Sequence, residues 1–229
     1  MSGGTKPGFK LKTPDRRFTL NGAAFYYDYK NLQVGFVNAN NIVETINAAS
    51  ARNYGIELEA TFRPTPSLNV SAYATYLNAR FKDFCNGYYR KLVTGQSEIP
   101  ACPTDPALVD LSGKRLANAP DVTVGGSIDW TADLGGGKLV LGGDINMQSE
   151  AFFTEFNNAD ARQESFFLIN ASATYHLPGD RFSIQAWGRN LTNEYVIANN
   201  IVAAGSYAYP RVGSIRPPRT YGVTLGVEF

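Results

Sequence analysis

The sequence predicts an all-β fold, an antiparallel sheet that crosses a membrane as part of a β-barrel, and three observations support this prediction. Apolar and polar residues alternate one by one through many segments of the chain. The connections between these segments alternate between short and long. Aromatic residues gather at the ends of the segments, as they do in the two aromatic girdles of an outer-membrane barrel.

The final segment, Tyr221–Phe229, shows the alternation most clearly. Its odd positions are Tyr, Val, Leu, Val and Phe, whereas its even positions are Gly, Thr, Gly and Glu. Because successive side chains of a strand point to opposite faces, one face of this strand is apolar and the other is small or polar. Such a strand suits a barrel wall that has lipid on one side and a polar lumen on the other.

The same period of two recurs along the chain and predicts about nine strands. The expected strands are a short one near Phe9–Thr13, a longer mixed one over Phe18–Val37, and then Tyr54–Phe62, Leu68–Tyr76, Val122–Trp130, Leu139–Gln148, Phe167–Leu177, Phe182–Arg189 and Tyr221–Phe229.

Turn-forming residues and longer polar stretches divide the connections into two classes. Tight turns are expected at Pro14–Arg16, Pro64–Ser67, Asp133–Gly137 and Pro178–Asp180. Long connections are expected near residues 38–52, 85–119, 152–165 and 191–216. Short periplasmic turns and long extracellular loops are typical of outer-membrane barrels, so the terminal strand is expected to end on the periplasmic side.

The composition of the 229 residues agrees with a membrane barrel and excludes other classes. The chain is 44% hydrophobic, yet its mean hydropathy is only −0.22. No apolar run approaches the roughly 20 residues that a transmembrane helix needs. The formal net charge of +1 offers no electrostatic case for binding nucleic acid.

The number of strands suggests that the sheet belongs to something larger. Bacterial single-chain barrels have an even number of strands. An open sheet cannot lie in lipid, because the backbone groups along its edges would be unsatisfied. About nine strands, with a first edge near Phe9, are therefore expected to be part of a larger barrel. The alternatives are a small autonomous β-barrel or a soluble β-sandwich that binds a ligand without transport.

Several short motifs, in order, resemble those of one family. They are Asn21–Gln33, the Gly-x-Glu-x-Glu strand within Asn53–Glu59, the strand entry Leu116–Pro120, the Asn-Leu-x-Asn-x-x-Tyr motif within Trp187–Tyr195, and the closing strand from Pro218. Each motif is weak alone, but together they cover nearly the whole chain. The sequence resembles the C-terminal β-barrel portion of a TonB-dependent outer-membrane receptor.

This resemblance implies a barrel of about 22 strands with a plugged lumen, in the outer membrane of a bacterium. Residues 1–229 would be the C-terminal part of that barrel, with the plug domain and the N-terminal barrel strands outside it. The family takes up scarce nutrients such as iron–siderophore complexes, cobalamin or saccharides. The implied partners are lipid, the rest of the barrel and its plug, the TonB complex acting through the plug, and a small-molecule ligand.

The resemblance also assigns roles to residues at the end of the chain and in the loops. The alternating Tyr221, Val223, Leu225, Val227 and Phe229 resemble the signal read by the barrel-assembly machinery. Extracellular loops of the family help to capture ligand, and arginines and aromatic rings suit anionic or planar ligands. The candidate ligand contacts are Tyr88, Tyr89, Arg90, Phe153, Arg162, Tyr207 and Arg211. Ordinary loop packing is the alternative for each of them.

The remaining reactive residues do not form a catalytic or metal site. Cys85 and Cys102 flank a segment that looks like a loop, and a disulfide between them, typical of an oxidising compartment, is favoured over two free thiols. His176 is the only histidine and lies beside an expected turn. Glu57 and Glu59 share one strand face and are expected to be water-exposed acids of the lumen. We expect no enzymatic activity and no cofactor.

Overall fold

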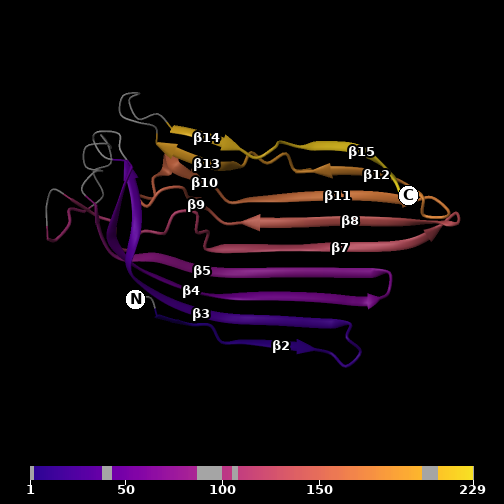
Figure 1. The fold of residues 1–229 in the computed structure, drawn as a ribbon, viewed down its shortest axis with the longest axis horizontal. Coiled ribbons are helices and arrows are strands. Elements are labelled where there is room, and N and C mark those ends of the chain that lie inside the picture. Colours follow the sequence, from indigo (N-terminus) through magenta and orange to yellow (C-terminus); the bar gives the residue numbers. More distant parts are fainter. Residues whose placement is uncertain (1–2, 38–42, 87–99, 105–107, 203–210, 229) are drawn as a thin grey trace.

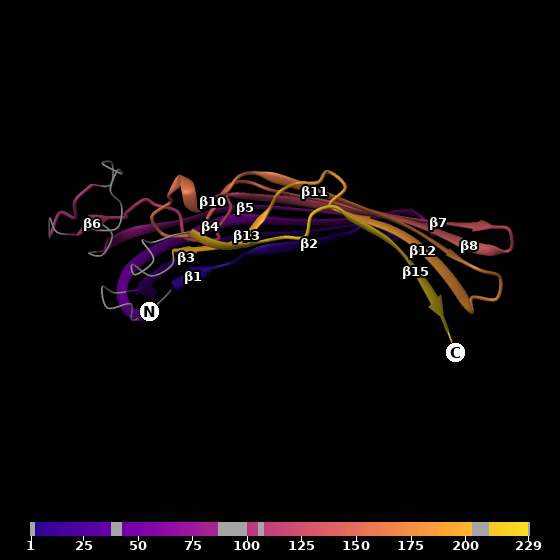
Figure 2. The same cartoon turned by 90° about the horizontal axis from the view of Figure 1, so that it is seen from above.

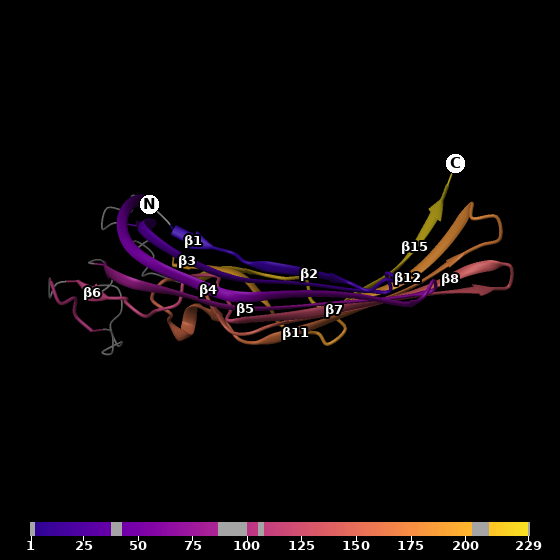
Figure 3. The same cartoon turned by 90° about the horizontal axis from the view of Figure 1, so that it is seen from below.

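The computed structural model describes residues 3–37, 43–86, 100–104, 108–202 and 211–228. It confirms the all-β prediction, because most of these residues belong to one long antiparallel sheet (Figure 1). The single helical element in the described ranges is a short 3-10 turn, η2 (Ala159–Ala161). Figures 2 and 3 show that the sheet is bowed and twisted rather than flat, as expected for strands of L-residues.

The sheet is nine strands wide, in the order β1-β3-β4-β5-β7-β8-β11-β12-β15. Strand β2 also pairs with β3, next to β1, so these two short strands form one row. The bounds are β1 (Gly3–Thr5), β2 (Gly8–Lys12), β3 (Phe18–Val37), β4 (Val43–Thr65), β5 (Leu68–Asn86), β7 (Val122–Leu134), β8 (Gly137–Gln148), β11 (Phe166–His176), β12 (Phe182–Arg189) and β15 (Thr220–Val227). Shorter strands lie in the connections: β6 (Val109–Asp110), β9 (Ala151–Phe152), β10 (Arg162–Gln163), β13 (Ile197–Val202) and β14 (Arg211–Ile215).

The two outer rows of the sheet run in the same direction. Strand β2 runs toward the turn that leads into β3, and each following strand of the sheet reverses direction down to β15. Both β2 and β15 therefore point to the turn end of the sheet (Figure 1). Within the described part of the chain, the first and last rows do not pair with each other.

Several sequence-based boundaries are wrong. Strand β5 continues to Asn86, beyond the expected end at Tyr76, and β13 and β14 lie inside the expected connection 191–216. The stretch 38–52 was expected to be a connection, but β4 already begins at Val43 and pairs with β3 from the register Val37↔Val43 onward. Strands β3 to β5 are thus much longer than the later strands. The alternation of apolar and polar residues is lost over 43–52, because polar residues stand there at both odd and even positions. A strand that projects beyond the lipid can carry polar residues on both faces.

The register gives the sheet one apolar and one polar face. Directly paired residues point to the same face, and one such row across six strands reads Gly22, Leu58, Ala74, Val124, Met147 and Phe167. A row on the opposite face reads Thr19, Thr61, Ser71, Ser127, Asp144 and Asn170. Among the described residues no second layer covers the apolar row, so we assign that face to lipid and the polar face to the lumen.

Exposure and hydrogen bonding agree with this assignment. On the lipid face, Ile56, Ile128 and Ile145 are 50%, 49% and 48% exposed, and water-soluble proteins rarely expose a large apolar patch of this kind. On the lumen face, the hydroxyls of Ser71 and Ser127 lie 2.8 Å apart, and Asn170 donates to Asp144 at 2.7 Å. The lumen face is therefore joined by polar cross-strand pairs.

The tight turns lie together at one end of the sheet, opposite the long connections (Figure 1). Gly135 and Gly136 connect β7 to β8 with φ of +59° and +79°, which is the geometry of a two-residue hairpin that matches the twist of its strands. In the turn between β2 and β3, Asp15 accepts hydrogen bonds from the Thr13 hydroxyl and the Arg17 amide. These bonds, the one from Thr13 first, lower the pKa of the Asp15 carboxyl.

Glycines of the sheet accommodate large aromatic rings of the lumen face. A Cβ at Gly125 would meet the ring of Tyr73, and a Cβ at Gly222 would meet the ring of Trp187. The hydroxyl of Tyr73 is then free to accept a hydrogen bond from Asn146. At Gly55 a Cβ would meet both the ring of Phe25 and the carbonyl oxygen of Tyr76. Each ring thus covers a stretch of bare backbone on a neighbouring strand.

We predict that Gly55→Ala destabilises the folded barrel by about 1–3 kcal/mol, because the added methyl group overlaps a backbone oxygen that cannot move without disturbing the strand pairing. Gly143→Ala is the matched control, since a Cβ there has its nearest neighbour at an ordinary 3.6 Å. The check is the urea concentration at the midpoint of unfolding in detergent. Equal midpoints for the two variants would contradict the prediction.

Candidate functional site at the loop end

The connection after β5 folds back over the loop end of the long strands. The amide of Leu111 donates to the carbonyl of Phe84 at 2.8 Å, and the amide of Leu116 donates to that of Ala79 at 3.0 Å. A small core forms where this segment meets the lumen face, and its buried members are Ala51, Phe81, Phe84, Val109, Leu111 and Phe156. The loop end is therefore packed by the chain itself.

A covalent bond holds the start of the same connection. The structure joins Cys85, near the end of β5, to Cys102, and their Cα atoms are 5.7 Å apart. Strand β6 lies beside this bond, with the register Cys85↔Asp110. The disulfide and the buried apolar cluster together fix where the long connection leaves and rejoins the sheet.

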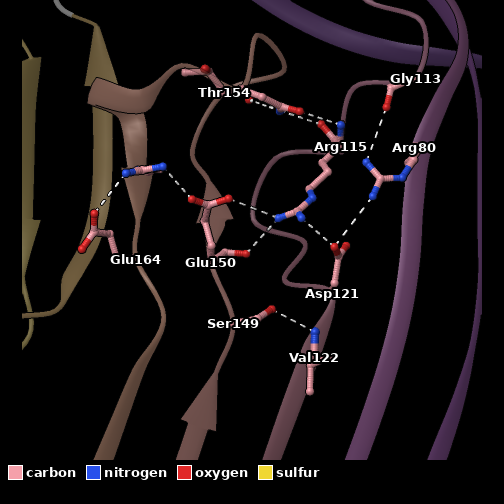
Figure 4. A network of polar contacts seen from close by, with 11 residues as sticks. Arg80, Gly113, Arg115, Asp121, Val122, Ser149, Glu150, Thr154 and Glu164 are labelled. Atoms are coloured by element: carbon pink, nitrogen blue, oxygen red, sulfur yellow. Dashed lines mark hydrogen bonds and ion pairs between the residues drawn. The ribbon is translucent and has the colours of Figure 1, made fainter.

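Arg115 is the centre of a polar network at the loop end (Figure 4). Its Nη2 lies 2.7 Å from Oδ2 of Asp121, just before β7. Its Nη1 lies 3.5 Å from Oε1 of Glu150 and 3.3 Å from the Glu150 carbonyl oxygen, just after β8. One guanidinium therefore ties together the loop ends of two neighbouring strands, using the planar fork of donors that arginine offers.

Two more arginines extend the network on both sides. Arg80 of β5 lies 3.7 Å from Asp121, and Arg162 of β10 lies 2.8 Å from the second oxygen of Glu150. Arg162 also pairs with Glu164 at 3.0 Å. The result is a line of alternating charges that runs Arg80, Asp121, Arg115, Glu150, Arg162, Glu164 from β5 to the start of β11.

Asn157 locks the next loop onto this network. Its φ of +54° lies in the left-handed region that asparagine tolerates. Its Oδ1 accepts a hydrogen bond from the Arg115 amide at 2.7 Å, and its Nδ2 donates to the Arg115 carbonyl at 3.0 Å and to the Thr154 carbonyl at 3.2 Å. The loop that carries Phe153 is held in this way against the connection that carries Arg115.

The same loop contains an acid in an unfavourable setting. Glu155 is half-buried, and burial raises the pKa of its carboxyl above the ordinary value of a glutamate. A raised pKa means that the folded loop favours the protonated acid over the charged one. The loop is therefore stabilised at low pH and loses that contribution as the pH rises through the raised pKa.

The structure places the residues that the sequence suggested as ligand contacts in different settings. Arg162 is engaged by two carboxylates, which gives it a role in joining loops. Phe153 is half-buried, and its amide donates to the carbonyl of Ala161 at 2.8 Å. Arg211 is the first residue of β14 and pairs with Val202, its backbone alone being described. Tyr88, Tyr89, Arg90 and Tyr207 lie outside the described residues.

The closing strand carries its apolar side chains on the lipid face. Tyr221, Val223 and Leu225 are 78%, 66% and 75% exposed, more than comparable residues of inner strands, because β15 pairs only with β12 among the described strands. Val227 lies on the same face, whereas Phe229 is outside the described residues.

The described residues contain no group of three or more His, Cys, Asp or Glu side chains that could hold a metal ion. His176 ends β11 opposite Lys138, at the turn end of the sheet. No helix in these parts of the chain is long and apolar enough to cross a membrane.

We predict that Arg115→Met loosens the loop end locally by about 2 kcal/mol, because both Asp121 and Glu150 lose a charge-assisted partner. The measurement is hydrogen exchange of the amides in residues 149–164. Lys138→Gln, an exposed cation at the opposite end, should change the stability by less than about 0.5 kcal/mol. Unchanged exchange in the Arg115 variant would show that the network does not hold the loops.

We predict that Glu155→Gln slows amide exchange in residues 152–161 at pH 8 but not at pH 4. At the higher pH the native glutamate is charged in a half-buried place, and the neutral glutamine removes that cost. At the lower pH both side chains are neutral, so the two proteins should behave alike. A difference that stays constant with pH would exclude titration of Glu155 as its cause.

Comparison with protein families gives a match over most of the chain. Residues 8–191 match the family model described as TonB dependent receptor-like, beta-barrel. The matched range includes all the long strands except β15 and contains the whole charged network. The description of this family is that of receptors.

Solved structures with the same fold are much longer proteins. The ferric yersiniabactin uptake receptor of Yersinia pestis matches 100% of this chain and 30% of its own, with 21% identity and a TM-score of 0.75. The ferric preacinetobactin receptor of Acinetobacter baumannii matches 98% of this chain and 29% of its own, with 17% identity and a TM-score of 0.64. The ferripyoverdine receptor of Pseudomonas aeruginosa matches 98% and 26%, with 16% identity and a TM-score of 0.60. The chain thus spans about 30% of such a receptor, and it belongs to the TonB-dependent receptor-like β-barrels of the bacterial outer membrane.

Proposed function

We propose that residues 1–229 form the C-terminal part of the barrel of a TonB-dependent receptor that takes up a ferric siderophore. The observation that carries the proposal is the open antiparallel sheet, nine strands wide, with one face suited to lipid and the other to a polar lumen. The structures that share this fold include receptors for ferric yersiniabactin, ferric preacinetobactin and ferripyoverdine. Iron chelates are therefore favoured over cobalamin or saccharides as the ligand.

The direction of the edge strands supports a larger barrel over a small autonomous one. Strands β2 and β15 run the same way, so direct closure would make them a parallel pair. Outer-membrane barrels are antiparallel throughout and have an even number of strands. Closure therefore requires an odd number of further strands between the two edges, which a barrel of about 22 strands supplies.

The partners of the chain follow from the same proposal. The remaining strands pair with the edges formed by β2 and β15, and lipid covers the exposed face. The plug fills the lumen and receives energy from the TonB complex. The barrel-assembly machinery reads the closing strand through Tyr221, Val223, Leu225 and Val227, whose exposed side chains on β15 suit that role, together with Phe229.

Ligand capture belongs to the loop end, where the long connections meet (Figure 1). We assign it to the aromatic and cationic residues of these connections, namely Tyr88, Tyr89, Arg90, Phe153, Tyr207 and Arg211. Arg162, held between Glu150 and Glu164, contributes by positioning the loop that carries Phe153. The disulfide between Cys85 and Cys102 would keep the first of these loops anchored in the oxidising periplasm and at the cell surface.

We predict that deleting the gene for the parent receptor, meaning the longer protein that contains this chain, abolishes energy-dependent uptake of one class of radiolabelled ferric siderophore under iron limitation. Cells that lack TonB should show the same loss, because uptake needs the energy it transmits. Uptake of labelled cobalamin serves as the control and should be unchanged. If iron uptake stayed normal and cobalamin or saccharide uptake were lost, the ligand would be cobalamin or a saccharide and not a ferric siderophore.

A further inference from the structure

The lipid face of the described strands carries no charged side chain between its two aromatic ends. On β4 the part from Tyr54 to Phe62 has nine residues, about the 9–11 that a tilted strand needs to cross a bilayer. Tyr26 pairs with Tyr54, and Tyr76 of the next strand pairs with Ile56, so three tyrosines end the apolar band at the loop end. Long loops mark the extracellular end of an outer-membrane barrel, so we place these rings at the outer leaflet.

Cations follow directly beyond the tyrosines on the same face. Arg52 stands two residues past Tyr54, roughly 6.6 Å further along β4. It is paired with Arg80 of β5, which is paired in turn with Arg115 of the following connection. Three arginines therefore stand side by side in one row across the sheet, at the level of lipid headgroups. Lys82 follows two residues after Arg80, and we call Arg52, Arg80 and Lys82 the outer basic patch.

Two members of the outer basic patch depend on one acid. Asp28 is the register partner of Arg52, and its Oδ1 lies 3.7 Å from Nε of Arg52 and 3.4 Å from Nζ of Lys82. Among the described residues, Nε of Arg52 has no hydrogen-bond partner. The other oxygen of Asp28 accepts a hydrogen bond from the Tyr26 hydroxyl at 3.1 Å. One carboxylate thus faces two cations, both at distances longer than those of charge-assisted hydrogen bonds.

Arg80, at the centre of the arginine row, has an equally distant partner (Figure 4). Its Nη2 lies 3.7 Å from Oδ2 of Asp121, an oxygen that Arg115 already holds at 2.7 Å. Asp83 pairs in register with Ser50, one row further toward the loop end, and accepts a hydrogen bond from its hydroxyl at 3.1 Å. Like charges in directly opposed positions destabilise a sheet, so the row calls for an anion between its arginines.

The direction of the outer basic patch selects the source of that anion. Ala51 and Phe81, which alternate with the arginines along β4 and β5, are buried in the apolar cluster on the lumen side. The patch therefore points away from cargo and plug and toward the lipid that surrounds the barrel. A phosphate group offers several oxygens to two guanidinium forks at once. Resting on the barrel of the proposed function but not on its cargo, we propose that the outer basic patch binds the phosphate groups of an outer-leaflet lipid.

The test is native mass spectrometry of the parent receptor, purified in detergent and mixed with lipid A that carries two phosphates. The double variant Arg52→Gln with Arg80→Gln should bind this lipid about 25-fold more weakly, because each cation near a charged membrane surface contributes roughly fivefold. Lys10→Gln with Lys12→Gln is the matched control and should bind normally, because these exposed cations of β2 lie on the lumen face. Lipid A without phosphates should not distinguish the variants. Equal binding of the phosphorylated lipid by all three proteins would overturn the proposal.

Thermal unfolding gives an independent readout and allows for a double variant that does not fold. Lipid A with two phosphates should raise the unfolding temperature of the unmodified receptor but not that of Arg80→Gln. Without lipid, these two proteins should unfold within about 2 °C of each other, because the ion pair of Arg80 is long and partly exposed. Equal stabilisation of both proteins by the lipid would contradict the proposal.

Two further results separate the possible failures. If inorganic phosphate alone stabilised the receptor as much as the lipid did, the ligand would be a soluble anion and the lipid proposal would fall. Energy-dependent siderophore uptake by the Arg80→Gln receptor should stay normal, because the patch lies outside the lumen. A parent protein without heat-modifiable migration would instead refute the barrel on which the proposed function rests.

Discussion

The whole structure depends on one constraint, that every backbone N–H and C=O group inside a lipid bilayer must find a partner in the protein. In a sheet this is possible only if strands pair on both sides, and each inner strand here pairs with a neighbour on either side. The alternation of side chains follows from it, because a strand between lipid and lumen has two chemically different faces. Among the described strands, β2 and β15 form the two edges, where backbone groups still need partners. Because these two strands run in the same direction, an odd number of further strands would complete the pairing.

The two ends of the sheet solve different physical problems. At the turn end, short hairpins close the strands with local geometry alone, as at Gly135 and Gly136. At the loop end, β3, β4 and β5 continue beyond the later strands. There the chain supplies its own core around Phe84 and Leu111, and a charged line through Arg115 ties the neighbouring connections together. Burial of apolar side chains inside the protein therefore stabilises mainly this end of the sheet.

The sequence predicted the strands well wherever they lie between lipid and lumen. Phe18–Val37 and the later strands from Val122 onward were placed closely, because their period of two has one physical cause. Prediction failed over 43–52, where polar residues occur at both parities. The charged network could not be predicted either, because Arg115 and Glu150 come together only through the pairing of β7 with β8. Arg162 looked like a free cation in the sequence, and only the folded loops show the carboxylates beside it.

The disulfide between Cys85 and Cys102 has a consequence for how such a protein can change over time. It clamps the chain at both ends of the intervening stretch, a separation of 17 positions. The entropy of closing a loop grows only slowly with its length, and insertions there would cost little stability. We therefore expect the sequence between the two cysteines to tolerate changes in both composition and length while strands β4 and β5 stay the same.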